Sequence, residues 1–138
     1  MSSAVRRVQY YYATVRGAPD EAFEILTHLA GQGVNLLALN TMPLGPDATQ
    51  MTLFPEDAPR LVEAARAAGL ALEGPHSALL VQGADEMGAV AKLHAQLHRA
   101  DIEVYASNAV TDGRGFYGYV LYMRPQDSEK AAALLARP

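Results

Sequence analysis

The sequence predicts an α+β fold made of two small units, each an antiparallel sheet with its helices on one face. One observation is a repeat, because strand, helix, strand, strand and helix patterns follow one another twice along the 138 residues. The other is hydrophobic spacing, which changes between the period of a strand and the period of a helix. We place the units at residues 1–73 and 74–138, and expect the second to lack its last strand.

The first unit begins with a β-branched and aromatic strand at residues 8–15. A helix follows, and its apolar face is predicted to contain Ala22, Phe23, Leu26, Leu29 and Ala30. Two strands at 34–41 and 49–54 flank a turn rich in Pro and Gly. A second helix is capped by Asp57 and ends at Gly69, and residues 70–72 are short enough for an edge strand.

The second unit repeats this order. Its strands are predicted at 77–82, 102–110 and 116–123. One helix runs from about residue 85 to 100, with an apolar stripe of Met87, Val90, Leu93 and Leu97, and the other runs from an Asp127 cap to residue 136. No strand pattern follows, so the edge of strand 77–82 needs cover from the first unit, another subunit or residues 70–72.

The order of strand, helix, strand, hairpin, helix and strand in the first unit is the split βαβ arrangement, which places two helices on one face of an antiparallel sheet. Each unit is near the lower size limit for an independent core, so we expect the two units to support one another.

Composition excludes several classes of protein and site. The chain has no cysteine, which excludes disulfides, thiolate zinc sites and cysteine nucleophiles. Its net charge is −4, without the basic run that nucleic-acid binding requires. Apolar runs are far shorter than a membrane span and no secretory h-region is present, so we expect a soluble, cytoplasmic protein without a membrane or nucleic-acid partner.

A family resemblance lies in residues 26–36, Leu-Thr-His-Leu-Ala-Gly-Gln-Gly-Val-Asn-Leu, together with Pro19 upstream. This stretch resembles the helix-to-strand junction of ACT domains, and especially the amino-acid-binding regulatory domain of 3-phosphoglycerate dehydrogenase. With the doubled topology, the resemblance covers nearly the whole chain. It implies ferredoxin-like βαββαβ units in a tandem ACT protein.

The resemblance implies a ligand site formed by a loop before the first helix and a segment after it, comprising Gly17, Ala18, Pro19, Gln32, Gly33, Val34 and Asn35. A free amino acid needs backbone N–H groups for its carboxylate and an oxygen for its ammonium group, and a helix N-terminus and an amide provide these. A glycine after a helix also serves as a C-terminal cap, which is the simpler role for Gly33.

The chain departs from the family at several positions. The His and Asn that the dehydrogenase-type loop places before its Pro are replaced by Val15 and Gly17. In the second unit, Asp101-Ile102-Glu103 stands where the Gly-Val-Asn triplet would be, and a carboxylate there would repel an amino acid's carboxylate. We therefore expect the ligand near residues 32–35, facing the second unit or another subunit.

Three weaker patterns have ordinary structural explanations. Residues 113–118 match G-x-G-x-x-G, but they lie in a predicted hairpin instead of opening a helix. His94 and His98 have the spacing of two metal ligands, although a solvated helix edge explains them better and we expect no metal or cofactor. Tyrosines in strands 8–15 and 116–123 place aromatic rings on both faces of a sheet; this favours a partner surface over cross-strand packing alone.

The sequence therefore predicts a non-catalytic regulatory protein, because it contains no recognisable catalytic constellation. We expect a homodimer that binds a small ligand, an amino acid, at the interface between ACT-like units and signals by allosteric linkage to a separate enzyme or regulator. Two alternatives stay open: a small ferredoxin-like or dimeric α+β barrel enzyme using His94, His98 or a Tyr, and a purely structural assembly module.

Overall fold

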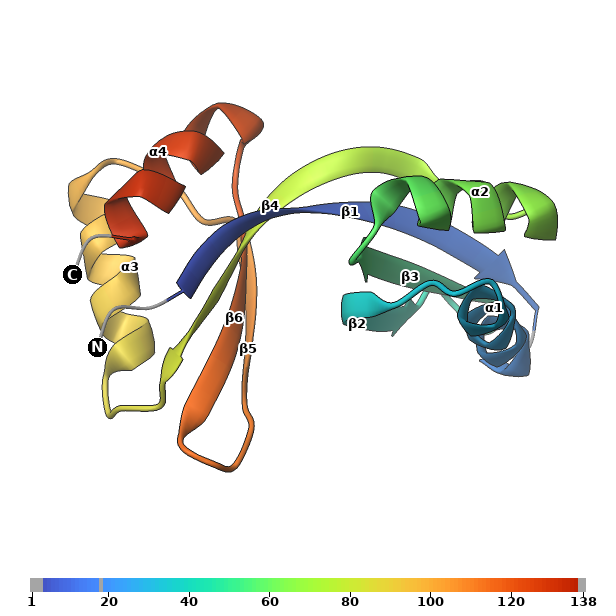
Figure 1. Cartoon of the computed structure of the whole chain (residues 1–138), viewed down its shortest axis with the longest axis horizontal. Coiled ribbons are helices and arrows are strands. Elements are labelled where there is room, and N and C mark those ends of the chain that lie inside the picture. Colours follow the sequence, from blue (N-terminus) through green and yellow to red (C-terminus); the bar gives the residue numbers. More distant parts are fainter. Residues whose placement is uncertain (1–3, 18, 137–138) are drawn as a thin grey trace. The chain divides into compact units, whose positions relative to one another are not determined.

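The computed structural model describes residues 4–17 and 19–136, and these form six strands and four helices (Figure 1). The sheet order is β2-β3-β1-β4-β6-β5. The chain divides into two compact units, one formed by Gln9–His76 and the other by Ser77–Pro138 together with Met1–Val8. The α+β prediction is confirmed. Among the described residues, no helix is long and apolar enough to cross a membrane.

The unit of residues 9–76 is built on β1 (Ala4–Arg16), β3 (Ala48–Pro55) and β2 (Leu36–Pro43), which pair antiparallel. Tyr11 lies opposite Leu53 and Ala13 opposite Met51. These four side chains share one face, because directly opposed residues point to the same side of a sheet. They form a core with residues of α1 (Pro19–Gly31) and α2 (Ala58–Ala68).

Helix α2 begins and ends as predicted. Asp57 has an extended backbone, and its side chain accepts a hydrogen bond from the Arg60 backbone N–H at 3.2 Å. Gly69 ends the helix with φ of +68°, a conformation that glycine adopts without strain. The predicted edge strand at residues 70–72 is wrong, because these residues form no strand; Leu70 and Leu72 pack against the core instead.

The predicted face of α1 is partly wrong. Ala22 and Leu29 are buried, but the Phe23 side chain is 69% exposed and Ala30 is also exposed. Ile25 packs against the core instead. Leu26 also packs against the core, as predicted, so the residues that pack follow the series i, i+3, i+4 and i+7 from Ala22, and Phe23 lies outside that stripe.

The other unit contains β4 (Glu73–Ala84), β6 (Phe116–Tyr122) and β5 (Ala106–Thr111), also paired antiparallel. Its helices, α3 (Ala89–Arg99) and α4 (Pro125–Leu135), pack on this sheet around a core that includes Leu79, Leu97 and Leu121. No strand follows α4 within the described part of the chain. Strand β1 is the neighbour of β4 in the sheet, so a strand from residues 1–73 covers the edge of residues 77–82, which is one of the three expected covers.

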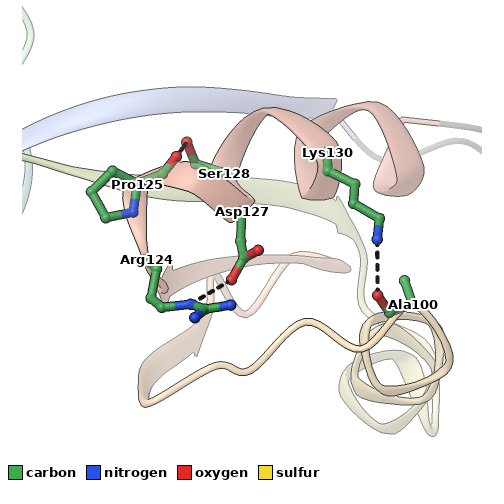
Figure 2. A network of polar contacts seen from close by, with 6 residues as sticks. All are labelled: Ala100, Arg124, Pro125, Asp127, Ser128 and Lys130. Atoms are coloured by element: carbon green, nitrogen blue, oxygen red, sulfur yellow. Dashed lines mark hydrogen bonds and ion pairs between the residues drawn. The ribbon is translucent and has the colours of Figure 1, made fainter.

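Polar contacts hold α4 in place (Figure 2). Lys130 Nζ donates to the Ala100 carbonyl at 3.1 Å, which joins α4 to the end of α3. The fully buried Ser128 donates to the Pro125 carbonyl at 2.9 Å. Asp127 does not cap the helix, contrary to prediction, because α4 already begins at Pro125; its carboxylate accepts a hydrogen bond from Arg124 Nε at 3.0 Å.

Two boundaries in this unit also differ from prediction. Helix α3 begins at residue 89, so Met87 precedes it and is fully exposed, whereas Leu93 and Leu97 are buried as expected. Strand β5 begins at residue 106, and Ile102 is buried in the core ahead of it. All six residues of β5 are exposed.

The tyrosines of the strands pack inside the units. Tyr117 and Tyr119 belong to the core around α3 and α4. In the unit of residues 9–76, the Tyr10 ring lies 5.4 Å from the Tyr12 ring, 5.1 Å from Phe54 and 5.2 Å from His76. The prediction that these strands present an aromatic partner surface is wrong, because Tyr10 is only 2% exposed and packing explains the rings.

Candidate functional site

A surface cavity of about 300 Å³ lies at the N-terminal end of α3. Three segments that are distant in sequence form it: the β4–α3 connection with the first turn of α3, the end of β5, and the start of β6. Its lining residues are Asp85, Glu86, Gly88, Ala89, Val90, Ala91, Ala109, Val110, Thr111 and Tyr117.

Local backbone structure explains why the chain leaves space here. The Asp85 backbone N–H donates to the Gly115 carbonyl at 2.8 Å, which fixes the connection beside the β5–β6 hairpin. Gly88 then precedes α3 with φ of +81° and supplies no side-chain cap. Gly88 supplies no side chain, and Ala89, Ala91 and Ala109 contribute only methyl groups to the lining, which leaves space here.

The lining contains carboxylates, backbone N–H groups and apolar side chains. Asp85 and Glu86 are both exposed, and the lining contains no lysine or arginine, so the carboxylates favour a positively charged group. In the first turn of α3 the Ala89 N–H already donates to the Glu86 carbonyl at 3.0 Å, so only the N–H groups that follow it in that turn favour an anion. Val90 and Val110 add apolar surface. The cavity is thus suited to a small zwitterion.

Sequence reasoning missed the charged residues of this cavity, although the repeat contained a signal. Asp85 and Glu86 occupy the connection between a strand and the first helix of their unit, and Gly17 occupies the corresponding connection in the other unit. The family resemblance concerns that first connection only.

The predicted loop residues lie before α1. Gly17 has φ of +112°, and its backbone N–H donates to the Asp47 carbonyl at 2.7 Å. Pro19 is the first residue of α1, and Ala18 lies outside the described residues. The loop is therefore tied to the turn that precedes β3.

The predicted segment after α1 completes the helix end. The Gly33 N–H donates to the Ala30 carbonyl at 3.0 Å, and the Val34 N–H donates to the Leu29 carbonyl at 3.0 Å. Gly33 has φ of +79°, as the simpler role of a C-terminal cap requires. Gln32 lies in the same turn and is exposed.

Asn35 already has a partner within its unit. Its Nδ2 donates to Glu56 Oε2 at 2.6 Å, and its backbone carbonyl accepts a hydrogen bond from the Glu56 N–H at 2.9 Å. Beside it, the Arg60 guanidinium covers Gly33 so closely that a Cβ there would lie 2.7 Å from Nη1. Asn35, Glu56 and Arg60 thus form a polar surface at the end of α1.

The structure does not bring the two predicted groups together within the unit. They lie at opposite ends of α1, whose 13 residues span about 20 Å at the usual helical rise. A ligand as small as an amino acid contacts one group or the other in this unit.

The remaining patterns have structural roles. Gly113 and Gly115 adopt positive φ in the β5–β6 turn, where the Asp112 carboxylate accepts hydrogen bonds from the Arg114 and Phe116 N–H groups. His98 is exposed on α3, while His94 contacts Tyr119. Within residues 4–17 and 19–136, no cluster of three or more His, Asp or Glu is placed to hold a metal ion.

Comparisons with known proteins identify the fold. No protein-family model and no curated protein sequence matches the chain. Among solved structures, protein BT0572 from Bacteroides thetaiotaomicron is similar with a TM-score of 0.81 at 15% identity, over 95% of this chain and 88% of that one. The regulatory subunit of aspartate kinase from Thermus thermophilus gives 0.68 at 14% identity, over 98% and 95%.

A third similar structure has a different description. VC0802 from Vibrio cholerae, described as a possible transport protein, gives a TM-score of 0.53 at 20% identity, over 98% of this chain and 87% of that one. At such low identities the similarity establishes the fold alone. The chain therefore has an α+β fold with ACT-like, ferredoxin-type βαββαβ units, shared with regulatory domains of aspartate kinase.

Proposed function

We propose that the chain is a non-catalytic regulatory protein of two tandem ACT-like units, which binds an amino acid and signals to a protein partner. The observation that carries this proposal is the extent of the structural match. The chain and the Thermus thermophilus regulatory subunit cover 98% and 95% of one another, so the similarity extends across a whole regulatory subunit.

The cavity at α3 supports an amino acid as the ligand. A volume of about 300 Å³ is at the small end of ligand pockets, as suits a metabolite of this size. Asp85 or Glu86 can pair with the ammonium group, and the first turn of α3 can bind the α-carboxylate where it is turned away from these two side chains, which would otherwise repel it. Val90 and Val110 would then contact an apolar side chain.

Signalling by such a protein needs only linkage between two binding events. A ligand that prefers one packing of the chain raises the population of that packing, and a partner that recognises it then binds more tightly. The uncharged edge strand β5 offers a surface for the proposed homodimer, because all six residues are exposed and its outer backbone groups can pair with another strand. Light scattering after gel filtration tests the dimer, and a monomer at all concentrations would contradict it.

The residues of the family resemblance remain a second proposed site for the same function. Gln32, Gly33, Val34 and Asn35 lie together, and a ligand there could use the Asn35 Oδ1 or compete with Glu56 for its Nδ2. Asn35→Ala would weaken binding at that site, whereas Asp85→Asn would weaken binding at the cavity. The two variants therefore locate the ligand.

A thermal-shift screen against the twenty amino acids tests the proposal. At a concentration of 100 times Kd, a ligand stabilises the folded chain by about 2.7 kcal/mol, which is readily measured as a rise in Tm. Calorimetric titration then compares the wild type with Asp85→Asn, Glu86→Gln and the control Glu129→Gln, which removes an exposed charge on α4. Absence of stabilisation by every amino acid would overturn this ligand class.

A further inference from the structure

A series of hydrogen bonds connects α3 to β6 and β5 beside the cavity. His94 Nε2 is hydrogen-bonded to the Tyr119 hydroxyl, and that hydroxyl donates to Ser107 Oγ at 3.0 Å. The His94 and Tyr119 rings also contact, with centroids 5.7 Å apart. Tyr119 is only 3% exposed, so its hydroxyl depends on these two partners.

Each of the three hydrogen-bonded residues adjoins a residue that lines the cavity. His94 lies one helical turn after Val90, and Ser107 lies two residues before Ala109 on β5. Tyr119 lies two residues after Tyr117 on β6 and directly opposite Ala109. Residues four apart on a helix and two apart on a strand share a face, so the three hydrogen-bonded residues lie alongside the cavity, next to residues of its wall.

The three hydrogen-bonded residues lie among apolar contacts, and their hydrogen bonds restrict where α3 can lie on the sheet. Leu93, Leu97 and Leu121 form the surrounding core. Apolar contacts are not directional and tolerate small displacements of a helix, whereas a buried hydroxyl must keep its partners within hydrogen-bond distance. Loss of one partner leaves a buried polar group unsatisfied, which is costly. The position of α3 relative to β5 and β6 is therefore restricted at His94.

We propose that Tyr119 is a positioning residue for the cavity: through His94 and Ser107 it fixes the spacing between α3 and β5, and it transmits ligand occupancy to that edge strand. A ligand bound between Val90 and Val110 contacts α3 and β5, which are the two elements that these hydrogen bonds join. Because Ser107 belongs to the exposed strand β5, movement there reaches a surface that a partner can contact. This inference rests on the proposed function.

The test compares Tyr119→Phe with Tyr105→Phe, which removes the hydroxyl of a tyrosine that is 58% exposed. The probe is the amino acid that raises the Tm of the wild type most. We expect Tyr119→Phe to bind it about tenfold more weakly, since the cavity loses its fixed width, and Tyr105→Phe to bind it as the wild type does. Ser107→Ala, at an exposed position, serves as a second variant if Tyr119→Phe fails to fold.

Imidazole NMR supplies a readout that a merely structural role would not change. In the wild type, ligand addition should shift the His94 ring resonances and leave those of the exposed His98 on the same helix unchanged. Tyr119→Phe or Ser107→Ala should reduce the His94 shift.

Unchanged affinity in Tyr119→Phe and Ser107→Ala would overturn the inference and leave the proposed function intact. Weaker binding without any His94 shift in the wild type would overturn the transmission step. A wild-type protein that binds none of the twenty amino acids would overturn the proposed function, and the inference with it.

Discussion

Replacing Gly74 by alanine should destabilise the unit of residues 9–76 far more than an ordinary glycine replacement. Gly74 lies near the start of β4 with φ of +146°. A Cβ there would lie 2.9 Å from Tyr11 Cδ2, 3.0 Å from the Tyr10 carbonyl oxygen and 3.3 Å from the His76 N. Two of these atoms are backbone, and the Tyr11 ring is 6% exposed, so nothing nearby can move without disturbing the core.

The magnitude follows from two contributions. An L-residue at positive φ costs about 1–2 kcal/mol, and forcing a methyl group into a packed site costs about 1–3 kcal/mol. We therefore expect Gly74→Ala to lower the free energy of unfolding by about 2–5 kcal/mol. Gly69→Ala is the matched control, because Gly69 has φ of +68° but no atom within 4 Å of its Cβ position. It should lose only the first contribution.

Urea unfolding followed by tyrosine fluorescence measures both variants, since the chain has seven tyrosines and no tryptophan. With a slope of about 2 kcal/mol/M, the urea midpoint of Gly74→Ala should fall by about 1–2.5 M. If the free energies of unfolding of Gly74→Ala and Gly69→Ala agree within about 0.5 kcal/mol, the atoms close to Gly74 do not contribute to the loss of stability. The steric reasoning is then refuted.

Three further predictions concern stability, and thermal melts with chemical denaturation check each of them. Asp57→Ala should cost about 1 kcal/mol, because it removes the cap of α2, and Asp127→Ala should cost less, since α4 begins without that carboxylate; equal losses would contradict the capping assignment. Leu121→Ala should cost about 3–5 kcal/mol because Leu121 is fully buried, while Val110→Ala, at a side chain 73% exposed, should change stability by less than about 0.5 kcal/mol. Phe23→Ser should be equally mild despite the helical spacing of Phe23, and a loss above about 1 kcal/mol would show that Phe23 packs against other residues in solution.

The order of elements was predictable because it depends on local hydrophobic spacing, which the sequence repeats. The exact starts of helices were less predictable. Two similar segments, Pro55-Glu56-Asp57 and Pro125-Gln126-Asp127, illustrate this. Pro125 is itself the first residue of α4, whereas Pro55 ends β3 and Pro59 occupies the first turn of α2. Proline suits the first turn of a helix, so the location of the next proline decides whether the aspartate can act as a cap.

The cavity was not predictable from local spacing. It requires residues 85–91, 109–111 and 117 to converge, and that convergence depends on strand register and on the backbone of Gly88. Asn35 illustrates the same limit, because its amide is bound by Glu56, 21 residues away. The family resemblance implied a ligand contact at Asn35, and nothing in the sequence indicated that Glu56 would bind its amide.

The grouping of Met1–Val8 with Ser77–Pro138 also affects the order in which the chain can fold. During synthesis from the N-terminus, the unit of residues 9–76 is complete once residue 76 has emerged. Residues 4–8 are synthesised earlier, but they can contact the rest of their unit only after β4, β5 and β6 have been synthesised. Such contacts between distant parts of the sequence raise contact order and slow folding. Residues 4–8 of β1 therefore reach their partners only after residues made much later in synthesis are available.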